Sequence, residues 1–139
     1  MEQTKAAKIF EMMMEKDSFT AWLGATCIEV GDGFCCLTMT IRTEMCNGFG
    51  IAHGGITYSL ADSALAFASN SHGWKALSIE TAISHLQPLY TGDVITAIAK
   101  EKSLGKKIAV YEVTITKGDE AVALFKGTVY RKSEKWLVG

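Results

Sequence analysis

Proline is nearly absent from this sequence, because Pro88 is the only one in 139 residues. No repeat, low-complexity segment or stretch with the composition of a linker interrupts the chain. A chain of this length can bury one sizeable hydrophobic core without disulfides. The sequence therefore predicts a single domain that spans residues 1–139.

An excess of one sign of charge is also absent. Fourteen basic residues stand against fifteen acidic ones, and the net charge is −1. The longest basic clusters are the pairs Lys106-Lys107 and Arg131-Lys132. Because nucleic-acid binding needs a basic patch, we expect no nucleic-acid partner. Hydrophobic residues make up 48% of the chain and charged residues only 21%, which favours some apolar surface in a subunit interface.

Metal-binding, secretory and membrane signals are missing as well. The four cysteines have no C-x-x-C spacing, so we expect reduced structural thiols and no metal site. Cys35 and Cys36 are adjacent in a strand-like run and are predicted to point to opposite faces. Residues 1–20 resemble neither a signal peptide nor a membrane span, so we expect a cytoplasmic protein with no membrane partner.

Hydrophobic periodicity predicts helices and strands in the order α, β, β, long α, then four β. An amphipathic helix is predicted over residues 1–17, and a longer helix from Gly54 to Ser71. Strands are predicted over 25–30, 34–42, 75–88, 93–103, 107–116 and 120–132. Consecutive strands joined by short turns imply an antiparallel sheet, and one segregated long helix makes the class α+β.

The long helix begins with two glycines and carries one charged residue, Asp62. Amides in the first helical turn lack intrahelical partners and lie at the positive end of the helix dipole. Without side chains above them, the amides of Gly54 and Gly55 are candidates for an oxyanion hole that binds a substrate oxygen.

Asp62 follows Gly55 by seven residues, so both lie on nearly the same helix face, roughly 10 Å apart along the axis. A carboxylate at that distance cannot act on a carbonyl bound at the glycine amides of its own chain. The two groups converge if a second subunit's helix runs antiparallel beside the first. The spacing thus leads to the hypothesis of two composite active sites in a homodimer. The structural alternative is that His53-Gly54-Gly55 is only a tight turn and Asp62 an exposed acid.

The segments "NGFGIAHGGITYSLADSALAFASNSHG" and "ISHLQPLYTGDVITAIA" resemble the hotdog-fold acyl-CoA thioesterases, most closely the PaaI-type group of the phenylacetate pathway. The resemblance runs from about Thr20 to Lys132, and its specific part is Asn47 to Asp62. It implies an antiparallel sheet curled around one long helix.

The resemblance also implies roles for single residues. Asp62 is implied as general base or nucleophile, acting in trans with the amides of Gly54 and Gly55. Asn47 is implied to hold the thioester or water, Ser78 to orient the attacking water, and His53 to support the helix start or contact the carbonyl. Each of the last three has a structural alternative: a turn cap, a polar strand residue and a satisfied histidine.

Acyl-CoA hydrolysis is chemically consistent with these residues, because a thioester is electrophilic and thiolate leaves readily. A carboxylate, a water and an oxyanion hole suffice without a cofactor or a Ser-His-Asp triad, and G-x-S-x-G is absent. Lys106, Lys107 and Arg131 are candidates for binding the phosphates of coenzyme A, although such lysines are often simply solvated. Candidates for the acyl pocket, suited to an aromatic or a medium to long acyl chain, are Phe49, Ile51, Tyr58, Phe67 and His85.

Two other functions remain open at this stage. A non-catalytic acyl-CoA-binding module would use the same fold, although a buried acid without a role is costly. A dehydratase or hydratase is the less favoured alternative, because His53 precedes the glycines instead of following an acid. We expect a homodimer, and the family pattern favours a homotetramer.

Overall fold

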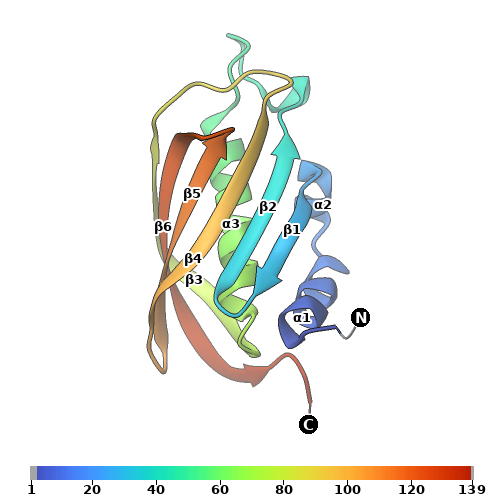
Figure 1. Cartoon of the computed structure of the whole chain (residues 1–139), viewed down its shortest axis with the longest axis vertical. Coiled ribbons are helices and arrows are strands. Elements are labelled where there is room, and N and C mark those ends of the chain that lie inside the picture. The colour runs from blue at the N-terminus through green and yellow to red at the C-terminus, as the bar shows by residue number, and fades with distance from the viewer. Residues whose placement is uncertain (1–2, 139) are drawn as a thin grey trace.

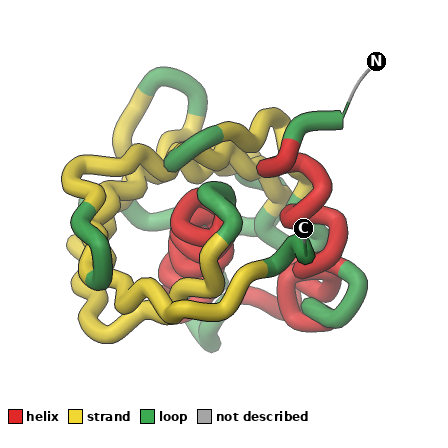
Figure 2. Tube along the Cα trace, turned by 90° about the horizontal axis from the view of Figure 1, so that it is seen from below, coloured by secondary structure: helices red, strands yellow, loops and turns green. Residues whose placement is uncertain are grey.

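The computed structural model describes residues 3–138 and has one layer of sheet curled around one helix (Figures 1 and 2). The helices are α1 (Lys5–Met14), α2 (Ser18–Leu23) and α3 (Gly54–Asn70), with a short 3-10 turn at Thr43–Met45. The strands are β1 (Thr26–Gly31), β2 (Phe34–Thr40), β3 (Trp74–His85), β4 (Val94–Leu104), β5 (Ile108–Lys117) and β6 (Glu120–Lys135). The predicted α+β class and the order of its long elements agree with this arrangement.

The six strands form one antiparallel sheet in the order β1-β2-β4-β5-β6-β3. Figure 2 shows the sheet around α3, with α1 and α2 on the side that the sheet leaves open. β3 follows α3 in the chain but lies at the sheet edge beside β6, which places α3 across the concave face. The concave face supplies the hydrophobic core. Cys35 points into this core and Cys36 is half-buried on the outer face, as the alternation predicts.

Small residues let the sheet approach α3 closely. Ala61, Ala64 and Ala68 of α3 are fully buried. Across from them, a Cβ atom placed on Gly127 of β6 would lie 2.6 Å from Cδ2 of Leu65. A real side chain cannot occupy that position without moving the helix or Leu65, so Gly127 is required for close packing.

We therefore expect Gly127→Ala to lower the free energy of unfolding by about 1–3 kcal/mol, the usual cost of overpacking a core. Urea denaturation followed by circular dichroism measures this change. Gly31→Ala is the matched control, because a Cβ atom there meets nothing within 4 Å. Equal stability of both variants would contradict the close contact.

The N-terminal prediction is corrected by the structure. The helix predicted over residues 1–17 is α1, which begins at Lys5 after the cap residue Thr4 and ends at Met14, and residues 1–2 lie outside the described part. Asp17 does not end this helix. Asp17 is the cap residue of a second helix, α2. Its carboxylate stabilises the first turn of α2, because it accepts hydrogen bonds from the Thr20 amide at 2.9 Å and from the Thr20 hydroxyl at 2.6 Å.

One face of α3 is left without cover in the single chain. Its members recur every three or four positions and are Gly55, Tyr58, Ser59, Asp62 and Ala66. The edge strand β3 exposes apolar side chains, with Leu77 61% and Ile79 60% accessible, and Leu77, opposite Tyr130, lies on the outer face of the sheet. The free edge of β3 and the uncovered face of α3 thus lie next to each other on one side of the molecule. Among the helices of residues 3–138, none has the length and apolar character to cross a membrane.

Candidate active site

The N-terminus of α3 carries the best-placed amide. His53 is the cap residue: its carbonyl accepts from the Ile56 amide at 2.9 Å, and its Nδ1 accepts from the Gly55 amide at 3.3 Å. Within residues 3–138, no hydrogen bond occupies the Gly54 amide. The two predicted donors therefore differ, since Gly55 is held by His53 and Gly54 is available.

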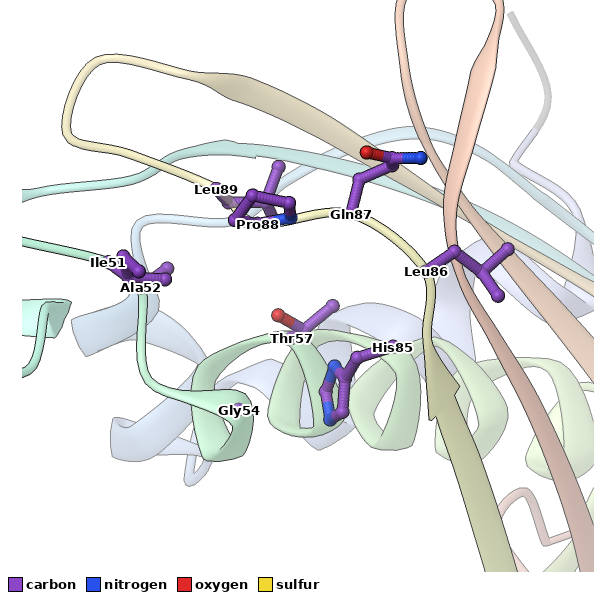
Figure 3. Close-up of a pocket in the computed structure, with 9 residues that line it drawn as sticks. All are labelled: Ile51, Ala52, Gly54, Thr57, His85, Leu86, Gln87, Pro88 and Leu89. Atoms are coloured by element: carbon purple, nitrogen blue, oxygen red, sulfur yellow. The ribbon is translucent and has the colours of Figure 1, made fainter.

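A pocket of about 330 Å³ opens at this helix end (Figure 3). Its floor is Gly54 and Thr57 of α3, and its walls are the loop residues Ile51 and Ala52 and the segment from His85 to Leu89. In Figure 3 the His85 side chain extends from the end of β3 toward the first turn of α3. The Gly54 amide thus lies in a recess large enough for a small acyl or thioester group.

His85 limits the space above position 54. A Cβ atom at Gly54 would lie 3.2 Å from Nε2 of His85, a tight contact that an exposed histidine ring relieves by moving a few tenths of an ångström. Neither Gly54 nor Gly55 has a positive φ, so their backbone conformation does not require glycine. A side chain at position 54 would therefore narrow the pocket at the Gly54 amide.

Asp62 lies on the uncovered face of α3, about two turns after Gly55, as the sequence spacing predicts. Burial, and secondly the negative charge of Asp17, raise the pKa of the Asp62 carboxyl above its ordinary value. The charge of Asp17 comes from α2, a helix that the sequence did not predict. A half-buried carboxylate with a raised pKa has the properties of a general base.

Asn47 takes the role of a turn cap in the single chain. Its Oδ1 accepts from the amides of Phe49 at 2.9 Å and Ile51 at 3.2 Å. Gly50, within this turn, has a φ of 77°. The oxygen of the Asn47 side chain is thus committed to the loop that forms one wall of the pocket, and its amide nitrogen remains available as a donor.

Ser78 lies on β3 opposite Val129 of β6, whose side chain is buried against the core. Paired residues share a face of the sheet, so Ser78 points to the helix side, yet it is exposed because nothing of the same chain covers it. Further along the same face, the Tyr58 hydroxyl and Thr81 Oγ1 are 2.5 Å apart and connect α3 to β3. The Tyr58–Thr81 pair has no local signal in the sequence, because it joins residues 23 positions apart.

The three residues predicted to bind coenzyme A line one pocket. Lys106, Lys107 and Arg131 surround a cavity of about 300 Å³ together with Trp74 and Tyr130. Arg131 Nη1 donates to the Gly105 carbonyl at 2.9 Å, whereas its buried Nε has no partner among residues 3–138. The pocket lies at the Trp74 end of β3, opposite to the His85 end.

The predicted acyl-pocket residues separate into two groups. Ile51 and His85 line the pocket at the helix end. Phe67 does not: it is 1% exposed, and its ring centre lies 4.7 Å from that of Phe10 in the core. Phe49 is 88% exposed, and the Tyr58 ring packs on Phe125. The sequence analysis missed Thr57 and residues 86–89, for which Pro88 was the only local marker.

A family model described as the thioesterase superfamily matches residues 49–124, the segment that contains both the pocket and Asp62. This chain belongs to the thioesterase superfamily. Acyl-coenzyme A thioesterase PaaI of Escherichia coli K12 is 38% identical over 128 residues, with 91% of each chain covered. The solved structure of the E. coli PaaI protein matches with a TM-score of 0.91 at 37% identity, covering 94% of this chain and 96% of that one.

A mutant structure of the phenylacetic acid degradation protein PaaI from Thermus thermophilus also matches, with a TM-score of 0.81 and 35% identity. It covers 84% of this chain and 100% of that one. The hotdog fold and the PaaI-type resemblance of the sequence are thereby confirmed.

Proposed function

We propose that this thioesterase hydrolyses acyl-CoA to the free acid and coenzyme A. The observation that carries the proposal is the Gly54 amide, which has no hydrogen-bond partner within residues 3–138 and lies in a pocket at the N-terminus of α3, the positive end of the helix dipole. The same helix presents the Asp62 carboxylate on its uncovered face. The name of the E. coli relative, an acyl-coenzyme A thioesterase, supports the coenzyme A ester as substrate.

The chemistry requires two groups and a water molecule. The thioester oxygen accepts a hydrogen bond from the Gly54 amide, and the helix dipole stabilises the negative charge that develops there. Asp62 removes a proton from a water molecule while the oxygen of that water attacks the carbonyl carbon. The tetrahedral intermediate then collapses, the C–S bond breaks, and the thiolate of coenzyme A leaves. No cofactor is needed for any of these steps.

A homodimer completes the site in this proposal. Two β3 strands paired antiparallel about their centres, between Ile79 and Glu80, would bring Trp74 of each chain beside the partner's His85. The pairing would also cover the exposed Leu77 and Ile79 and lay the two α3 helices side by side. The Asp62 carboxylate of one chain would then face the Gly54 end of the other.

The same pairing of β3 strands gives a role to the pocket lined by Lys106, Lys107 and Arg131. Because this pocket lies at the Trp74 end of β3, it would stand beside the partner's pocket at the helix end. A thioester bound at one Gly54 amide could thus extend its phosphates to Lys106, Lys107 and Arg131 of the other chain. Beyond the dimer, Ile108 and Tyr130 are exposed on the outer sheet face, which favours pairing of two dimers into a homotetramer. A cytoplasmic location is part of the same proposal.

Release of free thiol from a panel of acyl-CoAs tests this function. The panel contains phenylacetyl, hydroxylated phenylacetyl, benzoyl and C4 to C16 straight-chain esters, because the pocket admits an aromatic or an aliphatic group. Turnover of at least one class, with equilibrium sedimentation giving a dimer or tetramer, is the expected result. Tight binding without turnover of any ester would instead indicate a binding module.

Substitution of Gly54 tests the pocket. In Gly54→Ala the new methyl group would press on His85 Nε2 and narrow the recess at the amide, so we expect kcat/KM to fall about 10- to 100-fold, the effect of displacing a bound carbonyl by roughly 1 Å. Thermal stability should change little, since alanine suits a helix better than glycine. Steady-state kinetics beside the Gly31→Ala control measure the difference. Unchanged kcat/KM would show that the thioester binds elsewhere.

A further inference from the structure

The feature that the proposed function leaves unused is a polar contact between α2 and α3 beside Asp62. Asp17 Oδ2 accepts the Thr20 hydroxyl at 2.6 Å, and Thr20 Oγ1 lies 2.8 Å from Ser63 Oγ. A hydroxyl has one hydrogen, and Thr20 gives its hydrogen to Asp17, so Ser63 must donate to Thr20. The hydrogen bonds therefore run in one direction, from the Ser63 hydroxyl to the Thr20 hydroxyl and from there to the Asp17 carboxylate.

The two hydroxyl groups of this contact are shielded from water, whereas Asp17 is half-buried. Thr20 is 2% exposed and Ser63 8% exposed, although both side chains are polar. The amide of Thr20 also donates to Asp17, at 2.9 Å. Two hydrogen bonds thus hold the Asp17 carboxylate on Thr20, and a third joins Thr20 to Ser63 of α3, the residue directly after Asp62.

Asp17 is the charged group that acts on Asp62. α3 contains no second charged residue, and the charged side chains of α1 and β1 are exposed. Of the charged side chains on the strands that pack on α3, Glu101 of β4 lies on the helix side, where it bonds to His72 at 2.7 Å and accepts from the Tyr111 hydroxyl at 2.8 Å. Glu101 is not among the causes that raise the pKa of Asp62. After burial, the charge of Asp17 is the second cause that raises the pKa of Asp62. A negative charge near a half-buried carboxyl group opposes its ionisation.

We infer that Asp17 is a positioning residue for the hydrolysis: held by Thr20 and Ser63, its fixed negative charge strengthens Asp62 as the base that takes the proton from water. This inference rests on the proposed function, in which Asp62 is that base. A base becomes more effective as its proton affinity approaches the working pH. A residue that only capped α2 would have no effect on this step.

Asp17→Asn removes the charge and keeps the cap, because its Oδ1 can still accept from the Thr20 amide. Its Nδ2 would donate to the Thr20 hydroxyl, which would then donate to Ser63, so the contact with α3 is kept with its direction reversed. We expect the acidic limb of the pH profile of kcat/KM to move to lower pH, since Asp62 would ionise more easily. On the plateau, kcat/KM should fall about two- to tenfold, because the base is weaker. Asp32→Asn is the matched control, since it removes an exposed carboxylate from the β1–β2 turn and should leave the profile unchanged.

The decisive readout is the position of the acidic limb, measured with the full-length protein. An unshifted limb in a folded Asp17→Asn variant would overturn the inference, and so would an equal shift in Asp32→Asn. Asp17→Ser, a second uncharged cap, gives the same readout if Asp17→Asn does not fold. Asp62→Asn, measured in parallel, distinguishes the two hypotheses. Full activity of that variant would refute the proposed function and the inference together, whereas its inactivity beside an unshifted Asp17→Asn profile would refute only the inference.

Discussion

Asp62→Asn should lower kcat for acyl-CoA hydrolysis by about 10²- to 10⁴-fold, the usual contribution of a positioned general base. Asparagine has nearly the same shape as aspartate but cannot accept the proton that water loses. Binding of the acyl-CoA should change much less than kcat, because in the proposed site the Gly54 amide, and not Asp62, binds the thioester oxygen. Thiol release under saturating substrate, with equilibrium binding of the same ester, measures both quantities.

The same variant should be more stable than the parent at neutral pH. The pKa of Asp62 is raised in the folded chain, so its ionised form is disfavoured there. This penalty is absent below the ordinary pKa of an unfolded aspartate and develops as the pH rises through the folded pKa. Replacing the carboxylate removes the penalty at neutral pH. Asp119→Asn, in the exposed β5–β6 turn, is the control for charge removal alone. An active Asp62→Asn variant would exclude Asp62 as the base.

Complementation between two inactive chains should restore about a quarter of the parental activity. One chain carries Asp62→Ala, and the other carries Gly55→Leu. In its own chain, a Cβ atom at Gly55 meets only His53 Nδ1, at an ordinary 3.5 Å, and the position is exposed, so a side chain can begin there without moving the monomer backbone. On the uncovered face of α3, however, it would block the partner's carboxylate.

Random mixing makes about half of the dimers heterodimeric, and each of these contains one site with an intact glycine and an intact Asp62. Neither homodimer contains such a site. The unfractionated mixture should thus have about a quarter of the parental activity. Co-expression with two affinity tags isolates the heterodimer, in which one of the two sites works, so about half of the parental thiol release is expected against none from either homodimer. Inactive heterodimers of proven composition would show that the two groups do not act across the subunit interface.

Local patterns account for most of the fold. Residues 25–42 alternate with period two around Gly31-Asp32-Gly33, and the structure has the β1–β2 hairpin there with Gly33 at a φ of 67°. The long helix begins at Gly54 as predicted and ends at Asn70, one residue before the predicted end. These elements were predictable because hydrogen bonding within a helix or hairpin joins residues that are close in sequence.

The missed element, α2, has the opposite character. Its six residues are too few to form a stable helix alone. It is stabilised by the cap at Asp17, by burial of Leu23 and by the bond between Thr20 and Ser63, 43 residues later. The misplacement of Phe67 has a related cause, because α3 is apolar on most of its circumference and the sequence does not show which face meets the pocket.

By itself, the sequence determined that Gly54, Gly55 and Asp62 share a helix, that the two glycines begin it, and that Gly55 and Asp62 lie two turns apart on one face. These relations follow from helical geometry, which depends only on spacing along the chain. Only the tertiary structure decided that the His85 ring lies against Gly54, that Lys106, Lys107 and Arg131 line one pocket, and that Asp17 is linked through Thr20 to Ser63 of α3. Such contacts join distant segments, and they depend on how the sheet curls around α3 and how α2 closes its open side, which no local pattern specifies.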